Sequence, residues 1–272
     1  MKLIQPMVIA DDRDDGEWER LGEIIDVALK RQHFSMVYQP IVSVESSKLL
    51  GFEALTRCQS PEFGVVPPDR FIPHAEWSGR ILELGEWIFQ QTLLDLKLMQ
   101  QQIGLEDICM SINISPVQIS RGNVFERLMS QIHKLDIKPQ CIKIELTETA
   151  LIDNAETIVQ VFNAFKKEGV RVWVDDFGTG FASLCHLRKF VVDGLKIDKS
   201  FVEHIVTHND DFTLCSAIIA MAQRLGLQVV AEGVENDSQL QILSQLGCDL
   251  VQGYLLGRPA TVEQNLHLWA MV

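Results

Sequence analysis

Short apolar runs that each end in a carboxylate or an amide recur through most of this chain. The residues that end these runs are Glu53, Asn113, Glu145, the pair Asp175-Asp176, and Glu232. Burying a carboxylate at the end of a strand is costly unless it is paired or bound to a cation. Five carboxylates from separate segments are therefore expected where strand ends converge on metal, which is the arrangement of a barrel with a hard-cation site.

Strand-like and helix-like patterns alternate along the sequence. Strands are expected over 36–44, 50–57, 108–114, 141–147, 170–175, 194–197, 228–232 and 250–254, and helices over 17–31, 79–102, 124–135, 155–168, 182–190, 212–225 and 237–246. This order favours an α/β fold of the TIM-like (β/α)8 barrel type over an open doubly wound sheet. A length of 272 residues suits one such barrel, which typically takes about 250.

The first two expected strands are joined by only a few residues around Glu45-Ser46-Ser47. That connection has the length of a hairpin and is too short for a parallel crossover. One antiparallel strand near the start of the barrel is therefore predicted. Before these strands, residues 1–17 are acidic and are expected to be a flexible lead-in or linker, and residues 18–272 to form the barrel domain.

Charge and cysteine content restrict the environment and the partners. A net charge of −13 argues against binding of a nucleic-acid polymer and against direct membrane contact. An anionic substrate stays possible if metal ions reverse the local sign. The six cysteines are scattered without a Cys-x-x-Cys motif, as expected of buried thiols in a reducing compartment. We expect a cytoplasmic protein or the cytoplasmic part of a larger signalling protein.

The oxygen-rich set of candidate ligands suits Mg²⁺ or Mn²⁺ better than zinc or copper. Adjacent aspartates allow Asp175 to bridge two cations while Asp176 serves one. Two cations about 4 Å apart can activate a water and stabilise charge on a phosphodiester. Lys196 is the one cation placed at a strand within this series. It could hold the attacking water, help to deprotonate it, or form a salt bridge to one of the acids.

A glycine-containing segment, Asp176-Phe177-Gly178-Thr179-Gly180, follows one of the predicted strands. Its glycines permit positive φ angles, so a loop that closes over the site is expected. Glu148 is placed to accept hydrogen bonds from this loop.

Motifs in this order and spacing resemble those of the EAL-domain cyclic-di-GMP phosphodiesterases from about residue 20 to 272. The resemblance is carried by Tyr38-Gln39-Pro40, Glu53-Ala54-Leu55-Thr56-Arg57, Ser111-Ile112-Asn113-Ile114-Ser115, Glu145-Leu146-Thr147-Glu148, Asp175-Asp176-Phe177-Gly178-Thr179-Gly180, Leu195-Lys196-Ile197-Asp198, Ala231-Glu232-Gly233-Val234-Glu235 and Gln252-Gly253-Tyr254. It implies hydrolysis of cyclic di-GMP to linear pGpG by a water that two metal ions activate.

The resemblance also implies residue roles. The metal ligands would be Glu53, Asn113, Glu145 and Asp175 for the first ion, and Asp175 and Asp176, with Glu232 nearby, for the second. Lys196 would orient or deprotonate the water and Glu148 would brace the loop. Gln39, Arg57, Asp198 and Gln252 would line the substrate, with Glu235 as a secondary member. Two ions of Mg²⁺ or Mn²⁺ are the expected cofactors, and Ca²⁺ is expected to bind but to inhibit.

Two further functions stay open at this point. The first is a cyclic-di-GMP receptor with little turnover, and the second is another two-metal phosphoesterase on a barrel. The resemblance also suggests a homodimer, formed near the segment after the Asp176 loop and the helix expected over 212–225. Apolar residues on more than one face of that helix fit this suggestion, although some of them would simply cover the barrel.

Overall fold

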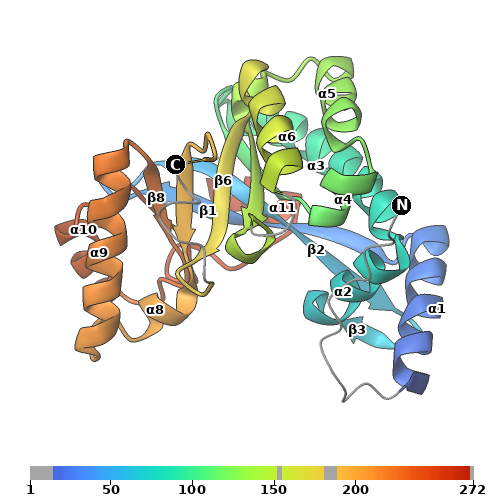
Figure 1. Ribbon diagram of the computed structural model, residues 1–272, viewed down its shortest axis with the longest axis horizontal. Coiled ribbons are helices and arrows are strands. Elements are labelled where there is room, and N and C mark those ends of the chain that lie inside the picture. Colours follow the sequence, from blue (N-terminus) through green and yellow to red (C-terminus); the bar gives the residue numbers. More distant parts are fainter. Residues whose placement is uncertain (1–14, 152–154, 181–188, 270–272) are drawn as a thin grey trace.

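The computed structural model describes residues 15–151, 155–180 and 189–269 (Figure 1). Eight strands close into a ring: β1 (Phe34–Ser43), β2 (Leu49–Ser60), β4 (Cys109–Asn113), β5 (Ile142–Thr147), β6 (Arg171–Phe177), β7 (Gly194–Ile197), β8 (Gln228–Ala231) and β9 (Leu250–Val251). The strand β1 runs antiparallel to both of its neighbours, β2 and β9, whereas the other adjacent pairs in the ring are parallel. A short strand, β3 (Gly64–Val66), pairs with β2 outside the ring. The predicted barrel is confirmed, and its antiparallel member is β1.

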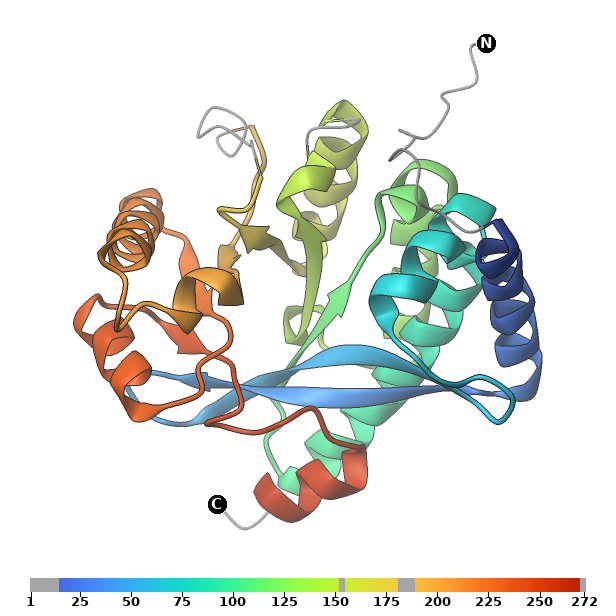
Figure 2. The ribbon, with the colours of Figure 1, turned by 90° about the horizontal axis from the view of Figure 1, so that it is seen from below.

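Helices cover the outside of the ring. They are α1 (Asp15–Arg31), α2 (Pro68–Ser78), α3 (Ile81–Ile103), α4 (Pro116–Arg121), α5 (Val124–Lys134), α6 (Ala155–Lys167), α8 (Lys199–Glu203), α9 (Asn209–Leu225), α10 (Asp237–Gln245) and α11 (Val262–Trp269), with two 3₁₀ turns, η1 (Pro139–Cys141) and η2 (Glu148–Leu151). The helices α1 and α2 lie with β3 at one end of the molecule, and α9 and α10 lie at the other (Figure 1). The last helix, α11, packs against α3 and β1 (Figure 2).

Local chemistry explains where several helices begin and end. Ser115 and Gln118 form a capping box at the start of α4, and Asn236 and Gln239 form another at α10. The helices α2 and α3 end at glycines with left-handed φ angles, Gly79 and Gly104. A glycine adopts this conformation without the steric cost that a Cβ would add.

Some predicted elements differ from those observed. The helix predicted over 79–102 is α3, but the patterns did not predict α2, which precedes it, or α4, α8 and α11. The strand predicted over 250–254 ends at Val251, because the chain turns at Gly253, where a Cβ would lie 2.1 Å from the backbone oxygen of Val234. The helix predicted over 182–190 falls mostly on residues 181–188, outside the described residues, as do residues 1–14 of the predicted lead-in.

Apolar side chains form two clusters. The larger fills the layer between the ring and its helices, and the smaller consists of Ile41, Trp173, Val230 and Leu250. These four belong to strands that are not all neighbours, so the smaller cluster lies inside the ring. None of the described helices combines the length and the apolar character that crossing a bilayer requires.

Candidate active site

Four carboxylates from four strands or strand ends surround one ammonium group inside the barrel. Lys196 Nζ, on β7, lies 2.6 Å from Glu232 Oε1, 2.8 Å from Glu145 Oε2, and 3.2 Å from both Glu53 Oε2 and Asp175 Oδ1. The lysine is 1% exposed. The expected convergence of the acids is therefore present, although Glu53 does not end its strand. It lies near the end of the parallel pairing of β2 with β4, and β2 continues outward to pair with β3.

The acids form two groups whose oxygens lie close enough together to hold a cation. Glu53, Glu145 and Asp175 make one group, and Asp175, Asp176 and Glu232 make the other. In each group the carboxylate oxygens that could act as ligands all lie within 4.8 Å of one another. Oxygen donors at this density fit Mg²⁺ or Mn²⁺. Because Asp175 belongs to both groups, the donor set fits a pair of neighbouring cations.

Amide side chains hold the first group in place. Asn113 Nδ2 donates to Glu53 Oε1 at 2.9 Å, which leaves the amide oxygen of Asn113 as its possible ligand atom. Gln252 Nε2 donates to Glu53 Oε2 at 2.7 Å and to Gln39 Oε1 at 3.1 Å. Gln39 in turn donates to the backbone oxygen of Gly257 at 3.2 Å. Two of the residues assigned to substrate, Gln39 and Gln252, therefore contact the carboxylate cluster or its immediate support.

Burial strongly affects the protonation of the acids. It is the main cause that raises the pKa of Glu145 to about 7 and that of Glu232 to about 8, with neighbouring carboxylates adding to the effect. Burial and the charge of Asp175 raise the pKa of Asp176 to about 6. Burial would also raise the pKa of Glu53, but the Lys196 charge and hydrogen bonds from Gln252 and Asn113 hold it below its usual value.

The central lysine is held in its charged form. Burial alone would lower the pKa of Lys196, but the surrounding carboxylate charges raise it well above its usual value. The ammonium group is therefore a hydrogen-bond donor in the metal-free protein.

The loop after β6 is tied to η2 by a buried carboxylate. Glu148 Oε2 accepts hydrogen bonds from the backbone N–H groups of Gly178, at 2.7 Å, and Gly180, at 3.3 Å. Gly178 has a φ of 102°, and a Cβ there would lie 2.9 Å from the ring of Phe201. Glycine at this position thus permits both the conformation and the close packing of the loop on α8.

A cavity of about 550 Å³ opens beside the acids. Asn113, Glu145, Asp175 and Asp176 are among its lining residues, and so is Arg57. The guanidinium of Arg57 donates to the backbone oxygen of Thr56 at 3.0 Å and is half-buried. The cavity therefore joins a possible metal centre to a planar cation suited to a phosphate oxygen.

Two residues predicted to line the substrate lie apart from the hydrogen-bonded cluster. Asp198 caps α8 by accepting from the Ser200 backbone N–H at 2.9 Å, and it is half-buried. Glu235 is exposed, and its backbone N–H donates to Gln239 Oε1 at 2.7 Å. Their roles at the site stay predictions.

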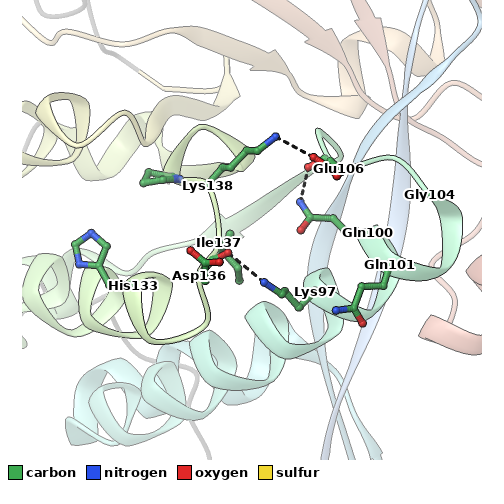
Figure 3. A pocket seen from close by; sticks show the side chains of 10 residues that line it. Lys97, Gln100, Gln101, Gly104, Glu106, His133, Asp136, Ile137 and Lys138 are labelled. Atoms are coloured by element: carbon green, nitrogen blue, oxygen red, sulfur yellow. Dashed lines mark hydrogen bonds and ion pairs between the residues drawn. The ribbon is translucent and has the colours of Figure 1, made fainter.

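A second, larger cavity of about 830 Å³ lies between α3 and α5, by the loops that lead into β4 and β5 (Figure 3). It is at the end of the barrel opposite the acids. Lys97 donates to the backbone oxygens of Leu135 and Asp136, and Lys138 pairs with Glu106 (Figure 3). These side chains bond to one another or to the backbone, and they do not converge as ligands of a common ion or substrate. We therefore place the active site at the smaller cavity.

Sequence patterns missed one wall of that smaller cavity. The helix α2 contributes Pro68, Asp69, Ile72, Pro73 and Glu76 to the lining. Glu76 Oε1 accepts from Ser115 Oγ at 2.7 Å and so joins α2 to α4. The sequence Pro67-Pro68-Asp69 could have predicted the start of α2, because a proline in the first turn followed by an acid is typical of a helix start.

Comparison with known proteins agrees with this architecture. The EAL domain family model matches residues 23–259. The chain therefore belongs to the EAL domain family.

Several relatives have named activities. The chain is 34% identical over 239 residues to the bifunctional diguanylate cyclase/cyclic di-GMP phosphodiesterase MucR of Pseudomonas aeruginosa, covering 88% of this chain and 35% of the relative. It is 37% identical over 233 residues to the cyclic di-GMP phosphodiesterase PdeR of Escherichia coli, covering 85% and 35%. The chain thus spans about a third of the length of these curated relatives.

Solved structures have the same fold. The MucR phosphodiesterase in complex with c-di-GMP superposes with a TM-score of 0.86 and 32% identity, covering 90% of this chain and 99% of that one. The EAL enzyme Bd1971 in its cAMP-bound form gives a TM-score of 0.89 and 35% identity, covering 94% and 71%.

Proposed function

We propose that this chain hydrolyses cyclic di-GMP to linear pGpG. The observation that carries the proposal is the pair of carboxylate groups that share Asp175, three of whose members, Glu145, Asp175 and Asp176, line a cavity that Arg57 also lines. The relatives named as cyclic di-GMP phosphodiesterases, and the MucR complex with c-di-GMP, support this choice of substrate. The domain would extend over residues 18–272, with residues 1–17 as a lead-in whose last three residues already belong to α1.

Two Mg²⁺ or Mn²⁺ ions are the proposed cofactors. Glu53, Asn113, Glu145 and Asp175 would hold one ion, and Asp175, Asp176 and Glu232 the other. When bound, the ions would activate a water and offset charge on the phosphodiester. Ca²⁺ accepts looser coordination and would fill the site without placing the water correctly.

The protein's own groups would position the reactants. Lys196, which contacts four of the carboxylates, would orient the water or help to deprotonate it. Arg57 would bind a phosphate oxygen through its planar set of N–H donors. Gln39, Gln252 and Asp198 would contact the nucleotide, with Glu235 as a secondary member. Glu148 would hold the loop after Asp176.

We also propose a cytoplasmic location and a homodimer. The five described cysteines are buried thiols, which suits a reducing compartment. One face of α9 carries exposed or half-buried apolar side chains at a spacing of three and four residues, namely Leu214, Ala217, Met221 and Leu225. A second copy of the chain would cover this stripe.

The test is incubation of the purified protein with cyclic di-GMP and Mn²⁺ or Mg²⁺, followed by chromatography. We expect pGpG to form, EDTA to abolish its formation, and Ca²⁺ to support substrate binding without turnover. Glu53→Ala removes a metal ligand and should lower kcat by about a hundredfold or more, since metal ligation contributes several kcal/mol. Glu168→Ala, which removes an exposed carboxylate far from the cavity, is the matched control.

Binding of cyclic di-GMP without product in either metal would favour the receptor alternative. Turnover by chelated, metal-free protein, or by Glu53→Ala at the wild-type rate, would contradict the proposed metal centre.

A further inference from the structure

A tryptophan lies across the inside of the barrel, next to the proposed metal ligands. Trp173 on β6 is 0% exposed and packs with Ile41, Val230 and Leu250 from other strands of the ring. In the strand register it is the direct partner of Glu145 on β5. Alternation along β6 places it on the same face as Asp175, two residues later. The indole is therefore adjacent to two acids of the first carboxylate group.

The neighbouring strand leaves room for this large ring. Gly194 on β7 is buried, and a Cβ there would lie 2.7 Å from both Cζ3 and Cη2 of Trp173. Real Cβ atoms essentially never approach other heavy atoms so closely. Lys196, whose ammonium group contacts the acids, lies two residues further along the same strand and faces inward like Gly194. The indole thus occupies the layer of the barrel next to the lysine and the carboxylates.

A second lysine fixes the ring from another direction. Lys143 on β5 is 4% exposed, and its Nζ lies 4.6 Å from the centroid of the Trp173 ring. This is the distance of a cation–π contact. Lys143 lies two residues before Glu145 on the inward face, so the Lys143–Trp173 pair is one layer below Glu145 and Asp175.

From this arrangement we infer that Trp173 is a positioning residue, the floor of the metal site, which sets its affinity for divalent cations. The indole fills the space into which Glu145 and Asp175 would otherwise shift. Ligands keep their geometry only when the groups behind them are fixed. The inference rests on the proposed function for the identity of the bound ions.

The test measures Mn²⁺ binding by calorimetry, without nucleotide, in three Trp173 variants. Trp173→Phe keeps an aromatic floor and should bind Mn²⁺ within about threefold of the wild type. Trp173→Ala and Trp173→Leu open space below the ligands, so their affinity should fall by about tenfold or more, the usual cost of losing the support behind a ligand. At saturating Mn²⁺ their kcat should recover while the KM for cyclic di-GMP stays unchanged.

Tryptophan emission gives an independent readout. The other four tryptophans, Trp18, Trp77, Trp87 and Trp269, lie on helices outside the ring. Addition of Mn²⁺ should change the emission of the wild type, and this change should be lost in Trp173→Phe.

The matched control is Phe162→Ala, which removes an equally buried aromatic ring from α6. It should lower the melting temperature but leave Mn²⁺ affinity unchanged. Wild-type Mn²⁺ affinity in folded Trp173→Leu, or equal weakening in Phe162→Ala, would overturn the inference. If the wild type binds Mn²⁺ but releases no pGpG, the proposed function fails while the role of Trp173 is still decided by the binding data.

Discussion

The backbone conformation at Asp176 explains how two consecutive aspartates, Asp175 and Asp176, can both reach the carboxylate groups. Asp175 points into the barrel, where it belongs to both carboxylate groups, and Asp176 has a φ of 53°. A left-handed conformation is uncommon outside glycine, although aspartate tolerates it better than most residues. The conformation turns the Asp176 side chain into the second group, because two consecutive residues of a regular strand would face opposite sides.

The buried acids should make the stability of the metal-free protein depend on pH. The pKa values of Glu145, Glu232 and Asp176 are about 7, 8 and 6 in the folded protein, above their usual values of 4.5, 4.5 and 3.8. The folded state therefore binds more protons than the unfolded state between about pH 4.5 and 8. In that window the free energy of unfolding falls as pH rises.

We expect the melting temperature of the metal-free protein to drop by several degrees between about pH 5 and 8, as measured by calorimetry in the presence of chelator. Cations compete with protons for the same oxygens, so Mn²⁺ should stabilise the protein more at pH 8 than at pH 6. Glu145→Gln cannot lose a proton and should make the drop smaller. An unchanged melting temperature across this range would show that the acids are ionised throughout.

At the scale of elements, the loop after β6 depends on its attachment to η2. Both hydrogen bonds from the loop end on one carboxylate oxygen of Glu148. Hydrogen bonds to a charged acceptor contribute roughly 1.5–3 kcal/mol each. Glu148→Gln keeps the size of the side chain but removes the charge, so it should loosen the loop that follows Asp176.

We expect Glu148→Gln to lower kcat by roughly ten- to a hundredfold, because a neutral amide oxygen accepts the two hydrogen bonds more weakly than a carboxylate does. It should also raise the Mn²⁺ concentration needed for half-maximal rate. Steady-state assays over a range of Mn²⁺ concentrations measure both effects. Glu156→Gln, in the first turn of α6, is the control. Equal rates in the two variants would remove Glu148 from the mechanism.

At the scale of the whole molecule, the loop connects the acids to the apolar face of α9. Gly178 packs against Phe201 of α8 and Ile218 of α9. A Cβ on Gly178 would lie 2.9 Å from the Phe201 ring and 3.4 Å from the Ile218 side chain. On the outer face of α9, Leu214 is 45% and Leu225 is 46% exposed. Covering this face with a second copy would restrain α9 and, through it, the loop, which shifts the loop toward its ordered state.

The proposed dimer predicts that specific activity rises with protein concentration. Leu214→Glu should place a charge in the interface, shift the protein toward monomer in light scattering and lower specific activity at a fixed concentration. Ala220→Glu, at an exposed position outside the stripe on the same helix, should have neither effect. A monomer at every concentration, with constant specific activity, would contradict the dimer but not the proposed hydrolysis.

Much of the architecture could be predicted from the sequence, because strand and helix periods and strand-end acids are local signals. These local signals predicted the barrel, the antiparallel strand near its start, and the set of acids that includes Glu53, Glu145 and Asp175. The helix α2 was not predicted, because Pro67, Pro68 and Pro73 interrupt the helical spacing of its apolar residues. The part of the cavity wall that α2 forms was therefore not predicted either.

Other features were decided only by the tertiary structure. Ring closure makes Asp175 common to two carboxylate groups, and it encloses Lys196 among four acids. Which residues share a layer depends on how distant strands are staggered, and no local pattern encodes that register. From the sequence alone, Trp173 is therefore identified only as an apolar residue in a predicted strand. Only the closed barrel, with Gly194 beside it and Lys143 on its ring, places it next to the proposed metal ligands.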